Sequence, residues 1–271
     1  MLNALDLESD GHIHTPLCNH AVGTMEEYVL AAVANGLRSI TFLEHLEVGI
    51  RSTPRTWLTE ADFDEYFREG DRLKSRYKNR ITIRLGVEAG YNPHQTEMLR
   101  TALGRYPWEW IGLSYHFYLV GDRHYNLVSR RRENLERLAA EGIDRVISAY
   151  LDGLLAGLDI VRPDVVCHLD AVLRHHPDIR FNDSHLHRID TLLTAMAWRG
   201  TALEINTSGY SIRNRPFPEP GILGKAMALH IPLVPGSDAH RPEDVGRCFD
   251  RLPRYLADAS ACPGARSPLA D

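Results

Sequence analysis

The stretch that decides the fold is Gly-His-Ile-His at residues 11–14. Side chains of a β-strand alternate between its two faces, so both imidazoles of this stretch point to the same side and can share a metal ion. Further along, acidic and imidazole side chains recur just after short apolar runs, as in Glu-His at residues 44–45 and Ser-Asp-Ala-His at residues 237–240. This layout is typical of a multi-metal hydrolase.

Short apolar runs alternate with longer amphipathic segments along nearly the whole chain, which predicts βα units and a mainly parallel sheet. About seven such units are expected from the hydrophobic pattern. The predicted strands lie near residues 11–14, 39–43, 81–87, 110–114, 165–167, 202–205 and 232–234. The sheet is expected to close into a barrel whose active site lies at one mouth.

Three helices are predicted in most detail. The first covers residues 25–34, with Thr24 as N-cap, Glu27 completing a capping box and a stop at Asn-Gly, residues 35–36. A second helix is predicted from about residue 60 to 77. A third runs from about 130 through 157, broken near Gly142 or Gly153.

No linker or fixed repeat divides the chain, which predicts one domain over residues 1–257. Residues 258–271 mix small residues with two prolines and carry little periodicity, so a loosely held tail is expected there.

A net charge of -5 argues against a general nucleic-acid or anionic-membrane binder and favours a small substrate. The four cysteines, Cys18, Cys167, Cys248 and Cys262, are widely spaced, which favours reduced thiols in the cytoplasm. There is no signal-peptide pattern and no apolar stretch of the ~18 residues that a membrane span requires. The sequence leaves the oligomeric state open.

The candidate metal ligands lie at or just beyond the carboxyl ends of predicted strands, or in the first loop. They are His12, His14, His20, His45, Glu88, His116, His168, Asp238 and His240. Any one of them alone is better explained as a core, capping or surface residue, and it is their joint placement that favours a metal site. His185 and His187 have the same spacing as the first pair, but on a predicted helix their rings point about 200° apart, and we assign them no metal.

These side chains are too many for one ion of four to six ligands, so two or three divalent ions are expected. Imidazole-rich sites suit the transition metals Zn, Fe or Mn. Such ions beside only two carboxylates leave a net positive charge that a phosphate monoester dianion nearly neutralises. A small phosphorylated substrate is therefore the expected partner.

The ordered motifs of residues 10 to 250 resemble those of the PHP (polymerase and histidinol phosphatase) family. They include His-x-His at 12–14, Cys-Asn-His-Ala at 18–21, Glu-His at 44–45, Gly-Val-Glu at 86–88, Ser-Tyr-His-Phe at 114–117, His-Leu-Asp at 168–170, Glu-Ile-Asn-Thr-Ser-Gly at 204–209 and Gly-Ser-Asp-Ala-His at 236–240. The family usually has Asp-His where this chain has Glu44 and His45; the ligand itself is unchanged.

The resemblance implies a single-domain distorted (β/α)7 barrel of the TIM type with a trinuclear site. One ion would be held by His12, His14, Glu88 and Asp238, a second by Glu88, His116 and His168, and a third by His20, His45 and His240. The motifs look most like those of the monofunctional phosphatases, which implies hydrolysis of L-histidinol phosphate to L-histidinol and phosphate in histidine biosynthesis.

For catalysis we expect a metal-bridging hydroxide to attack phosphorus in line, with Glu88 as the bridging carboxylate. Asp238, His240 or a water supplies the proton for the leaving alkoxide. Arg174 and Arg213 are expected to clamp the phosphate. Tyr91, Phe117 and Tyr118 are expected to line the pocket for the alcohol half.

Two alternatives stay open. A PHP-type nucleotide or oligonucleotide phosphoesterase or exonuclease would use the same scaffold, although the acidic balance and the lack of a basic groove disfavour it. A metal-binding module without catalysis would hold ions yet release no phosphate from any monoester.

Overall fold

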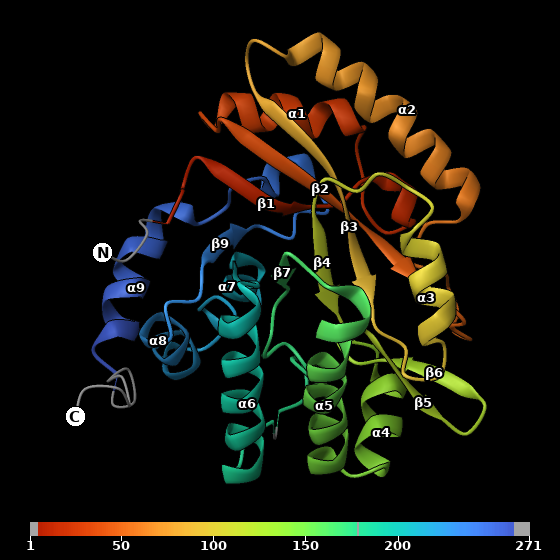
Figure 1. Ribbon diagram of the computed structural model, residues 1–271, viewed down its shortest axis with the longest axis vertical. Coiled ribbons are helices and arrows are strands. Elements are labelled where there is room, and N and C mark those ends of the chain that lie inside the picture. Colours follow the sequence, from red (N-terminus) through yellow and green to blue (C-terminus); the bar gives the residue numbers. More distant parts are fainter. Residues whose placement is uncertain (1–4, 178, 263–271) are drawn as a thin grey trace.

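Seven parallel strands alternate with helices in the computed structural model, which describes residues 5–177 and 179–262 (Figure 1). The strands of this sheet are β1 (Ser9–Ile13), β2 (Ser39–Glu47), β3 (Thr82–Gly90), β4 (Ile111–Ser114), β7 (Val165–Val166), β8 (Ala202–Asn206) and β9 (Leu233–Gly236). Their order in the sheet is their order along the chain, and each neighbouring pair is parallel. The predicted α/β architecture is confirmed.

The sheet nearly closes into a barrel where β1 meets the chain that follows β9. The N–H of His14 donates to the carbonyl of Ala239 (3.0 Å), and the N–H of Asp238 donates to the carbonyl of His12 (2.9 Å). The pairing is a single bridge between Ile13 and Ala239, because the backbone turns left-handed at Asp238, with φ 52°. The predicted distorted (β/α)7 barrel is thus confirmed, and this seam is a point of distortion.

Helices surround the sheet, and Figure 1 shows α1 and α2 over β1 to β3 and the neighbouring pair α5 and α6 below β4 and β7. The helices are α1 (Met25–Ala34), α2 (Glu60–Tyr77), α3 (Thr96–Leu103), α4 (Arg132–Ala140), α5 (Ile143–Val161), α6 (Asp183–Arg199), α7 (Tyr210–Arg213), α8 (Pro220–Ala228) and α9 (Leu252–Ser260). Short 3-10 turns cover Pro16–Cys18, Thr207–Gly209, Pro242–Asp244 and Phe249–Arg251.

The helix predictions are confirmed by the local chemistry that motivated them. Thr24 and Glu27 form the reciprocal capping box of α1, which satisfies backbone N–H groups that a helix start leaves unpaired. The long third segment breaks into α4 and α5 at Gly142, where φ is 92°, a conformation that favours glycine. Helix α5 continues unbroken through Gly153. The missing Cβ at this position makes room for the ring of Tyr115, which packs against the helix.

Strands β2 and β3 run further than predicted, and this matters for the site. The expected ends were residues 43 and 87, but the strands continue to Glu47 and Gly90. Their register pairs His45 directly with Glu88. These two residues therefore lie within the strands rather than after them, so the ladder itself sets their spacing.

Sequence reasoning missed an antiparallel hairpin, β5 (Phe117–Val120) and β6 (Arg123–Asn126). The signal was present, since Gly121 and Asp122 separate two runs rich in β-formers, and Gly121 has a φ of 63°. The hairpin follows His116 and projects from the barrel beside α4 (Figure 1). It builds one wall of the cavity described below.

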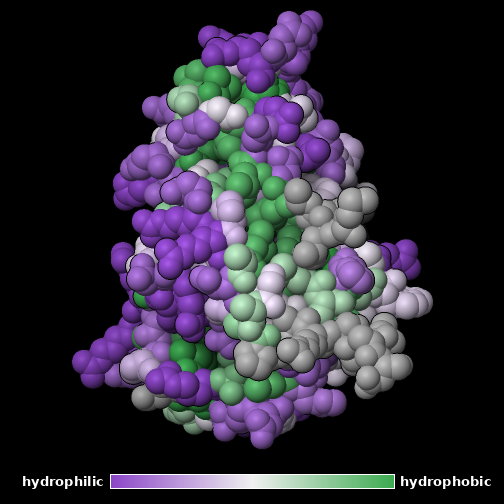
Figure 2. Space-filling model, turned by 90° about the vertical axis from the view of Figure 1, so that its left-hand side faces the viewer, coloured by the Kyte–Doolittle hydropathy of each residue, from purple (hydrophilic) through white to green (hydrophobic). Residues whose placement is uncertain are grey.

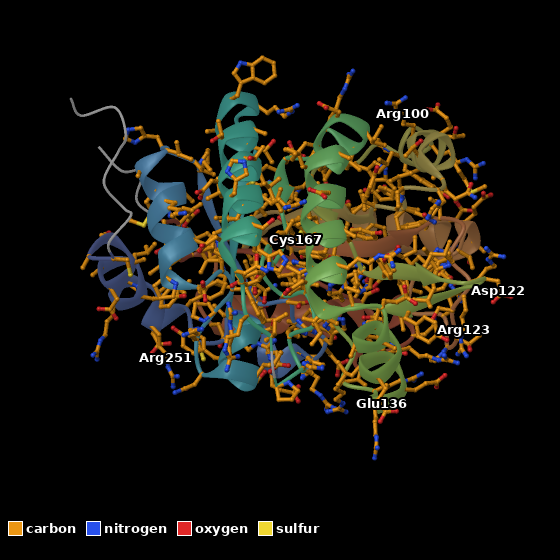
Figure 3. All side chains as sticks on the ribbon, turned by 90° about the horizontal axis from the view of Figure 1, so that it is seen from below. Arg100, Asp122, Arg123, Glu136, Cys167 and Arg251 are labelled. Carbon is orange, nitrogen blue, oxygen red and sulfur yellow. The ribbon has the colours of Figure 1, made fainter. Side chains whose placement is uncertain are left out.

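The interior of the barrel is closed by a small apolar cluster of Leu43, Val165, Cys167 and Ala202, all buried. Cys167 lies near the centre of the molecule seen from below in Figure 3. A larger apolar core lies between the sheet and the helices, as expected for a parallel sheet covered on its outer face.

The carboxyl-terminal boundary differs from the prediction. Helix α9 continues to Ser260, past the tail boundary expected at Asp258, and it packs Leu252, Tyr255 and Ala259 inward. Residues 263–271 of the expected tail lie outside the described residues. Over the described ranges, no helix is long and apolar enough to cross a membrane.

Asp10 fastens the barrel seam, which gives a stability prediction. Its buried carboxylate accepts from the N–H of Ser237 (2.9 Å) and from the N–H of Gly246 (2.9 Å). Asp10→Asn turns an amide NH₂ toward one of these donors. Leaving a buried donor unpaired should lower the free energy of unfolding by about 1–3 kcal/mol, measured by denaturant titration.

Asp64→Asn, on the exposed face of α2, is the control and should change the free energy of unfolding by less than about 0.5 kcal/mol. Equal stability of the two variants would show that the Asp10 contacts do not hold the seam.

Candidate metal centre

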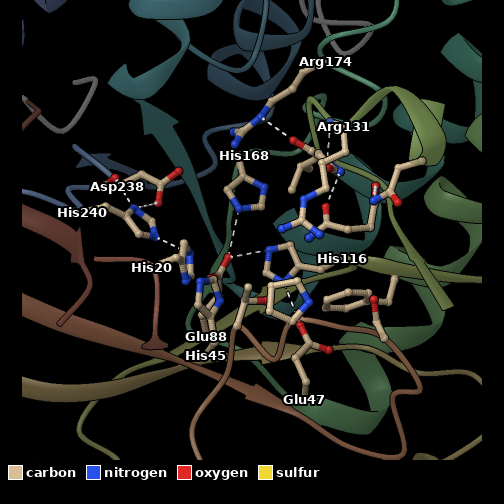
Figure 4. A pocket seen from close by; sticks show the side chains of 18 of the residues that line it. His20, His45, Glu47, Glu88, His116, Arg131, His168, Arg174, Asp238 and His240 are labelled. Carbon is tan, nitrogen blue, oxygen red and sulfur yellow. Dashed lines mark hydrogen bonds and ion pairs between the residues drawn. The ribbon is translucent and has the colours of Figure 1, made fainter. Parts of the chain in front are cut away.

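The candidate ligands converge at the carboxyl end of the barrel, as their placement on the strands predicts (Figure 4). His12 lies in β1, His45 in β2 and Glu88 in β3, while the others follow β1, β4, β7 and β9 or the first 3-10 turn. Most are buried, with His14 and Glu88 wholly inaccessible, and His20 is the exposed member. Every ligand predicted from the sequence reaches this one site.

Glu88 is the centre of the group. Its carboxylate oxygens approach ring nitrogens of five histidines: His45 (2.8 Å), His168 (2.9 Å), His116 (3.3 Å), His12 (3.6 Å) and His14 (3.7 Å). A carboxylate so placed can bridge neighbouring cations.

The geometry brings together donor atoms in several overlapping sets, each within 4.8 Å. They are His12, His14 and Asp238; His45, Glu88 and His116; His14, His45 and His240; Cys18, His20 and His240; and His12, Cys167 and Glu204. The first two sets agree in part with the expected ligands of the first and second ions. His14 adds to the set expected for the third, and Cys18 and Glu204 were not among the expected ligands.

The protonation of the rim histidines provides a direct test of whether a cation fits. The Nδ1 of His20 lies 2.9 Å from the carbonyl of Cys18, and the Nδ1 of His240 lies 3.0 Å from the carbonyl of Asp238. A carbonyl only accepts, so each Nδ1 carries the proton and each neutral ring presents a lone pair at Nε2. Those two Nε2 atoms lie 2.8 Å apart. Facing lone pairs repel, and a shared cation relieves the repulsion.

The buried histidines repeat the pattern with carboxylates as their partners. His12 donates from Nδ1 to Glu204 (2.7 Å), and its Nε2 faces the Nε2 of His14 at 2.9 Å. His116 donates from Nδ1 to Glu47 (2.8 Å), and its Nε2 faces Glu88. Carboxylate–histidine pairs of this kind fix the tautomer and orientation of metal ligands. The donor set fits divalent transition ions.

The pKa shifts at the rim and centre agree with metal ligation. Burial lowers the pKa of His45 and His240, so these rings are neutral. Burial raises the pKa of Glu88, but His116 and His12 outweigh it and hold that pKa well below its ordinary range. The pKa of Asp238 is likewise low, because His14 and His12 outweigh its burial. Burial lowers the pKa of His12, His14 and His116 as well, but the neighbouring carboxylates outweigh it and raise each pKa, so a bound cation would replace a ring proton there.

A cavity of about 220 Å³ opens beside the ligands (Figure 4). One wall carries the candidate ligands, and the opposite wall comes from residues 52–56, the hairpin and the segment that enters α4. Arg174 and Arg131 both line it. Arg174 donates to the carbonyl of Val128 (3.3 Å) and Arg131 to that of Thr53 (3.4 Å), and within the described part of the chain neither pairs with a carboxylate.

Only some of the residues predicted to bind substrate line this cavity. Arg174 and Phe117 line the cavity, whereas Arg213, Tyr91 and Tyr118 are not among its lining residues. Arg213 instead donates to both oxygens of buried Asp170 (3.1 and 3.0 Å) and lies over the ring of Phe217. Tyr91 packs edge-on against Tyr115 in the core, and Tyr118 lies next to Phe117 on β5, where side chains alternate between faces.

Sequence reasoning missed Arg131 and the polar residues around it, among them Ser52, Thr53, Asn126 and Asn134. Three successive arginines at 130–132 were the available signal, but a run of charges is usually a solvated face and does not show which member turns inward. The helical pair His185 and His187 lies on α6, as predicted, where His185 completes a capping box.

Two curated relatives align over nearly their whole length. The "Probable histidinol-phosphatase" of Deinococcus radiodurans is 31% identical over 259 residues, covering 92% of this chain and 92% of the relative. The "Histidinol-phosphatase" of Bacillus subtilis is also 31% identical over 259 residues, covering 89% of this chain and 96% of the relative.

Solved structures share the fold. A protein from Listeria monocytogenes superposes with a TM-score of 0.81 at 22% identity, covering 90% of this chain and 99% of that one. Histidinol phosphate phosphatase from Lactococcus lactis, solved with zinc, L-histidinol and phosphate, superposes with a TM-score of 0.72 at 18% identity, covering 95% of this chain and 97% of that one.

The family assignment rests on two matches along the chain. Residues 10–208, which include β1 to β8, match the PHP domain, and residues 225–260 match the PHP-associated family. With the ligands converging at one end of a seven-stranded parallel barrel, this chain belongs to the PHP domain family.

Proposed function

We propose that this protein is a metal-dependent phosphomonoesterase that hydrolyses L-histidinol phosphate to L-histidinol and phosphate. The observation that carries the proposal is the cluster of candidate cation ligands around Glu88 in one small cavity with two arginines that pair with no carboxylate among residues 5–177 and 179–262. The curated relatives at 31% identity are named histidinol-phosphatases, and the Lactococcus protein holds zinc, L-histidinol and phosphate.

We assign three ions to the cluster, as zinc or as another transition metal. His12, His14, Glu88 and Asp238 would hold one, Glu88, His116 and His168 a second, and His20, His45 and His240 a third. Bound there, the ions supply Lewis-acid stabilisation of phosphate oxygens and activate water at neutral pH.

The arginines orient the phosphate. Arg174 comes from the segment after His168 and Arg131 from the entrance to α4, so they face the cluster from the other side of the cavity (Figure 4). Guanidinium groups hold phosphate oxygens in fixed geometry, which aligns phosphorus for in-line attack. Asp238 is ionised, and His240 engages its Nδ1 proton with a carbonyl, so we assign both to ligation and the leaving-group proton to water.

The cavity favours a small monoester. Its volume of about 220 Å³ suits a compact alcohol, which would lie against Phe117 and the neutral polar residues of the outer wall. Oligonucleotides are bound in open basic grooves with stacking aromatic rings. Apart from the histidine rings of the candidate metal centre, the described residues of the cavity wall offer one aromatic ring, that of Phe117.

The first prediction concerns substrate and metal together. The purified protein should release phosphate from histidinol phosphate faster than from adenosine monophosphate or a short oligonucleotide, as measured by a phosphate-release assay. A chelator should abolish this activity, and zinc or manganese should restore it, because the cluster needs its cations. Faster turnover of the nucleotides would favour the nucleotide phosphoesterase alternative, and metal uptake without turnover would favour a binding module.

Glu88→Gln should lower kcat at least about 100-fold, because it removes the negative charge of the buried carboxylate that contacts five histidine rings. The measurement is steady-state kinetics with circular dichroism to verify folding. Glu97→Gln, 81% exposed on α3, is the matched control and should retain wild-type kinetics. Near-normal turnover of a folded Glu88→Gln protein would exclude a bridging role for this carboxylate.

Arg174→Ala should raise KM at least about tenfold and weaken inhibition by inorganic phosphate, since hydrogen bonds to charged groups contribute about 1.5–3 kcal/mol. Arg213→Ala should act differently: loss of the cation beside buried Asp170 should lower the free energy of unfolding by about 3 kcal/mol. Inhibition by phosphate and thermal unfolding separate the two roles. A large rise in KM for Arg213→Ala at unchanged stability would return Arg213 to the phosphate clamp.

A further inference from the structure

Glu204, on β8, contacts two of the candidate ligands from outside the cluster. Its carboxylate is 2% exposed. Oε1 accepts from the Nδ1 of His12 (2.7 Å), and Oε2 accepts from the backbone N–H of His168 (2.7 Å) and from the side chain of Asn206 (3.1 Å). One side chain therefore contacts both His12 and His168, which are 156 residues apart in the sequence.

The contact with His168 falls on a strained backbone. His168 has a φ of 26°, in the left-handed region that non-glycine residues rarely adopt. Such a conformation persists only where surrounding interactions hold it, and it is often found at functional sites. The hydrogen bond from its N–H to Glu204 is such an interaction. It turns the imidazole so that Nε2 lies 2.9 Å from Glu88.

The neighbouring strand leaves room for this carboxylate. Gly236, at the end of β9, faces Glu204, and a Cβ there would overlap the carboxylate oxygen and lie 2.9 Å from the Cβ of His12. No positive φ is recorded for Gly236, so the requirement is for space rather than for backbone freedom. Gly236 therefore provides the space that the carboxylate of Glu204 occupies.

Glu204 also lies within 4.8 Å of the donor atoms of His12 and Cys167, which is a possible metal-binding set in itself. The hydrogen bonds favour a supporting role instead. The Nδ1 of His12 and Oε1 are only 2.7 Å apart, and Oε2 already accepts from two N–H groups. Three donors thus engage the carboxylate, two of them from candidate ligands.

We propose that Glu204 is the positioning residue of the buried half of the metal centre. It fixes the tautomer of His12 through Nδ1, so that Nε2 faces the cluster, and it holds the left-handed backbone that aims His168 at Glu88. His20 and His240 are fixed instead by the backbone carbonyls of Cys18 and Asp238, so their orientation does not depend on Glu204. This inference rests on the proposed metal-dependent function, because it needs ions at the cluster.

The test is metal binding by the full-length protein. Metal-free protein is titrated with zinc in competition with a chromophoric chelator, and the zinc retained after dialysis is measured by elemental analysis. Glu204→Gln keeps the shape, but its amide can accept only through one oxygen. We expect the zinc ligated by His12 and His168 to bind about 10- to 100-fold more weakly, with part of the bound zinc retained at the rim histidines.

Asp170→Asn is the matched control. Asp170 is equally buried, at 3% exposed, and it pairs with Arg213 rather than with a candidate ligand. It should unfold more easily yet hold as much zinc as the wild type. Gly236→Ala, which displaces the carboxylate without removing it, should reproduce the zinc loss, and Glu204→Asp should fall between wild type and Glu204→Gln. These variants supply the result if Glu204→Gln does not fold.

The outcomes separate the two proposals. Wild-type protein that takes up no zinc would overturn the metal-dependent function itself. Wild-type protein that binds zinc, with Glu204→Gln binding it equally well, would overturn only the positioning role. Zinc loss from Asp170→Asn as large as from Glu204→Gln would also overturn it, because the loss would then follow general loosening of the fold.

Discussion

The ionised carboxylate of Glu88, buried among five imidazoles, is the interaction on which the rest of this structure depends. A charge taken out of water is costly unless it is compensated. The Nδ1 protons of His12 and His116 are engaged by Glu204 and Glu47, so the Nε2 atoms of these rings are the ones that face Glu88. Divalent cations held between these Nε2 atoms and the carboxylate would compensate its charge in place of the ring protons.

The barrel is what allows this concentration of polar groups. Parallel pairing places the carboxyl ends of the strands at one mouth, and the register of β2 with β3 puts His45 beside Glu88 before any loop is considered. The apolar cluster around Leu43 and Cys167 closes the interior beneath them. Asp10 then ties the last ligand-bearing turn to the first strand through Ser237 and Gly246. The candidate ligands are thus held by strands of one continuous sheet, by the turns that follow them and by the first 3-10 turn.

The success and the failures of sequence reasoning have a common physical reason. Strand ends and helix caps depend on neighbours in the chain, so the convergence of the candidate ligands and the capping box of α1 could be predicted from local pattern. Partners that meet only after folding leave no local signal: Glu204 reaches His12 across 192 positions, and Glu47 reaches His116 across 69. The same limit explains Arg213 and Arg131. Arg213 was expected to clamp the phosphate, but a distant acid, Asp170, turns it away from the cavity, whereas Arg131, which lines the cavity, was not predicted.

The partners of the ligands also give the centre two unlike sides. The Nδ1 atoms of His12 and His116 meet the carboxylates of Glu204 and Glu47, which add negative charge behind the buried ligands and increase their basicity. The Nδ1 atoms of His20 and His240 hydrogen-bond to the neutral carbonyls of Cys18 and Asp238, with the Asp238 carboxylate 3.6 Å from the Nδ1 of His240, and these rings lie at the more accessible edge.

A cation held by the rim rings is therefore less compensated than one held inside. The guanidinium groups of Arg174 and Arg131, which bond to carbonyls and to no carboxylate of the described chain, add positive charge to the same cavity. A phosphate dianion would be attracted most strongly to this more positive edge of the cavity. The carboxylates behind the buried histidines would stabilise the cations held further inside. Because their hydrogen-bond partners differ, the buried histidines favour tight binding of cations, and the rim histidines leave a more positive edge that attracts anions.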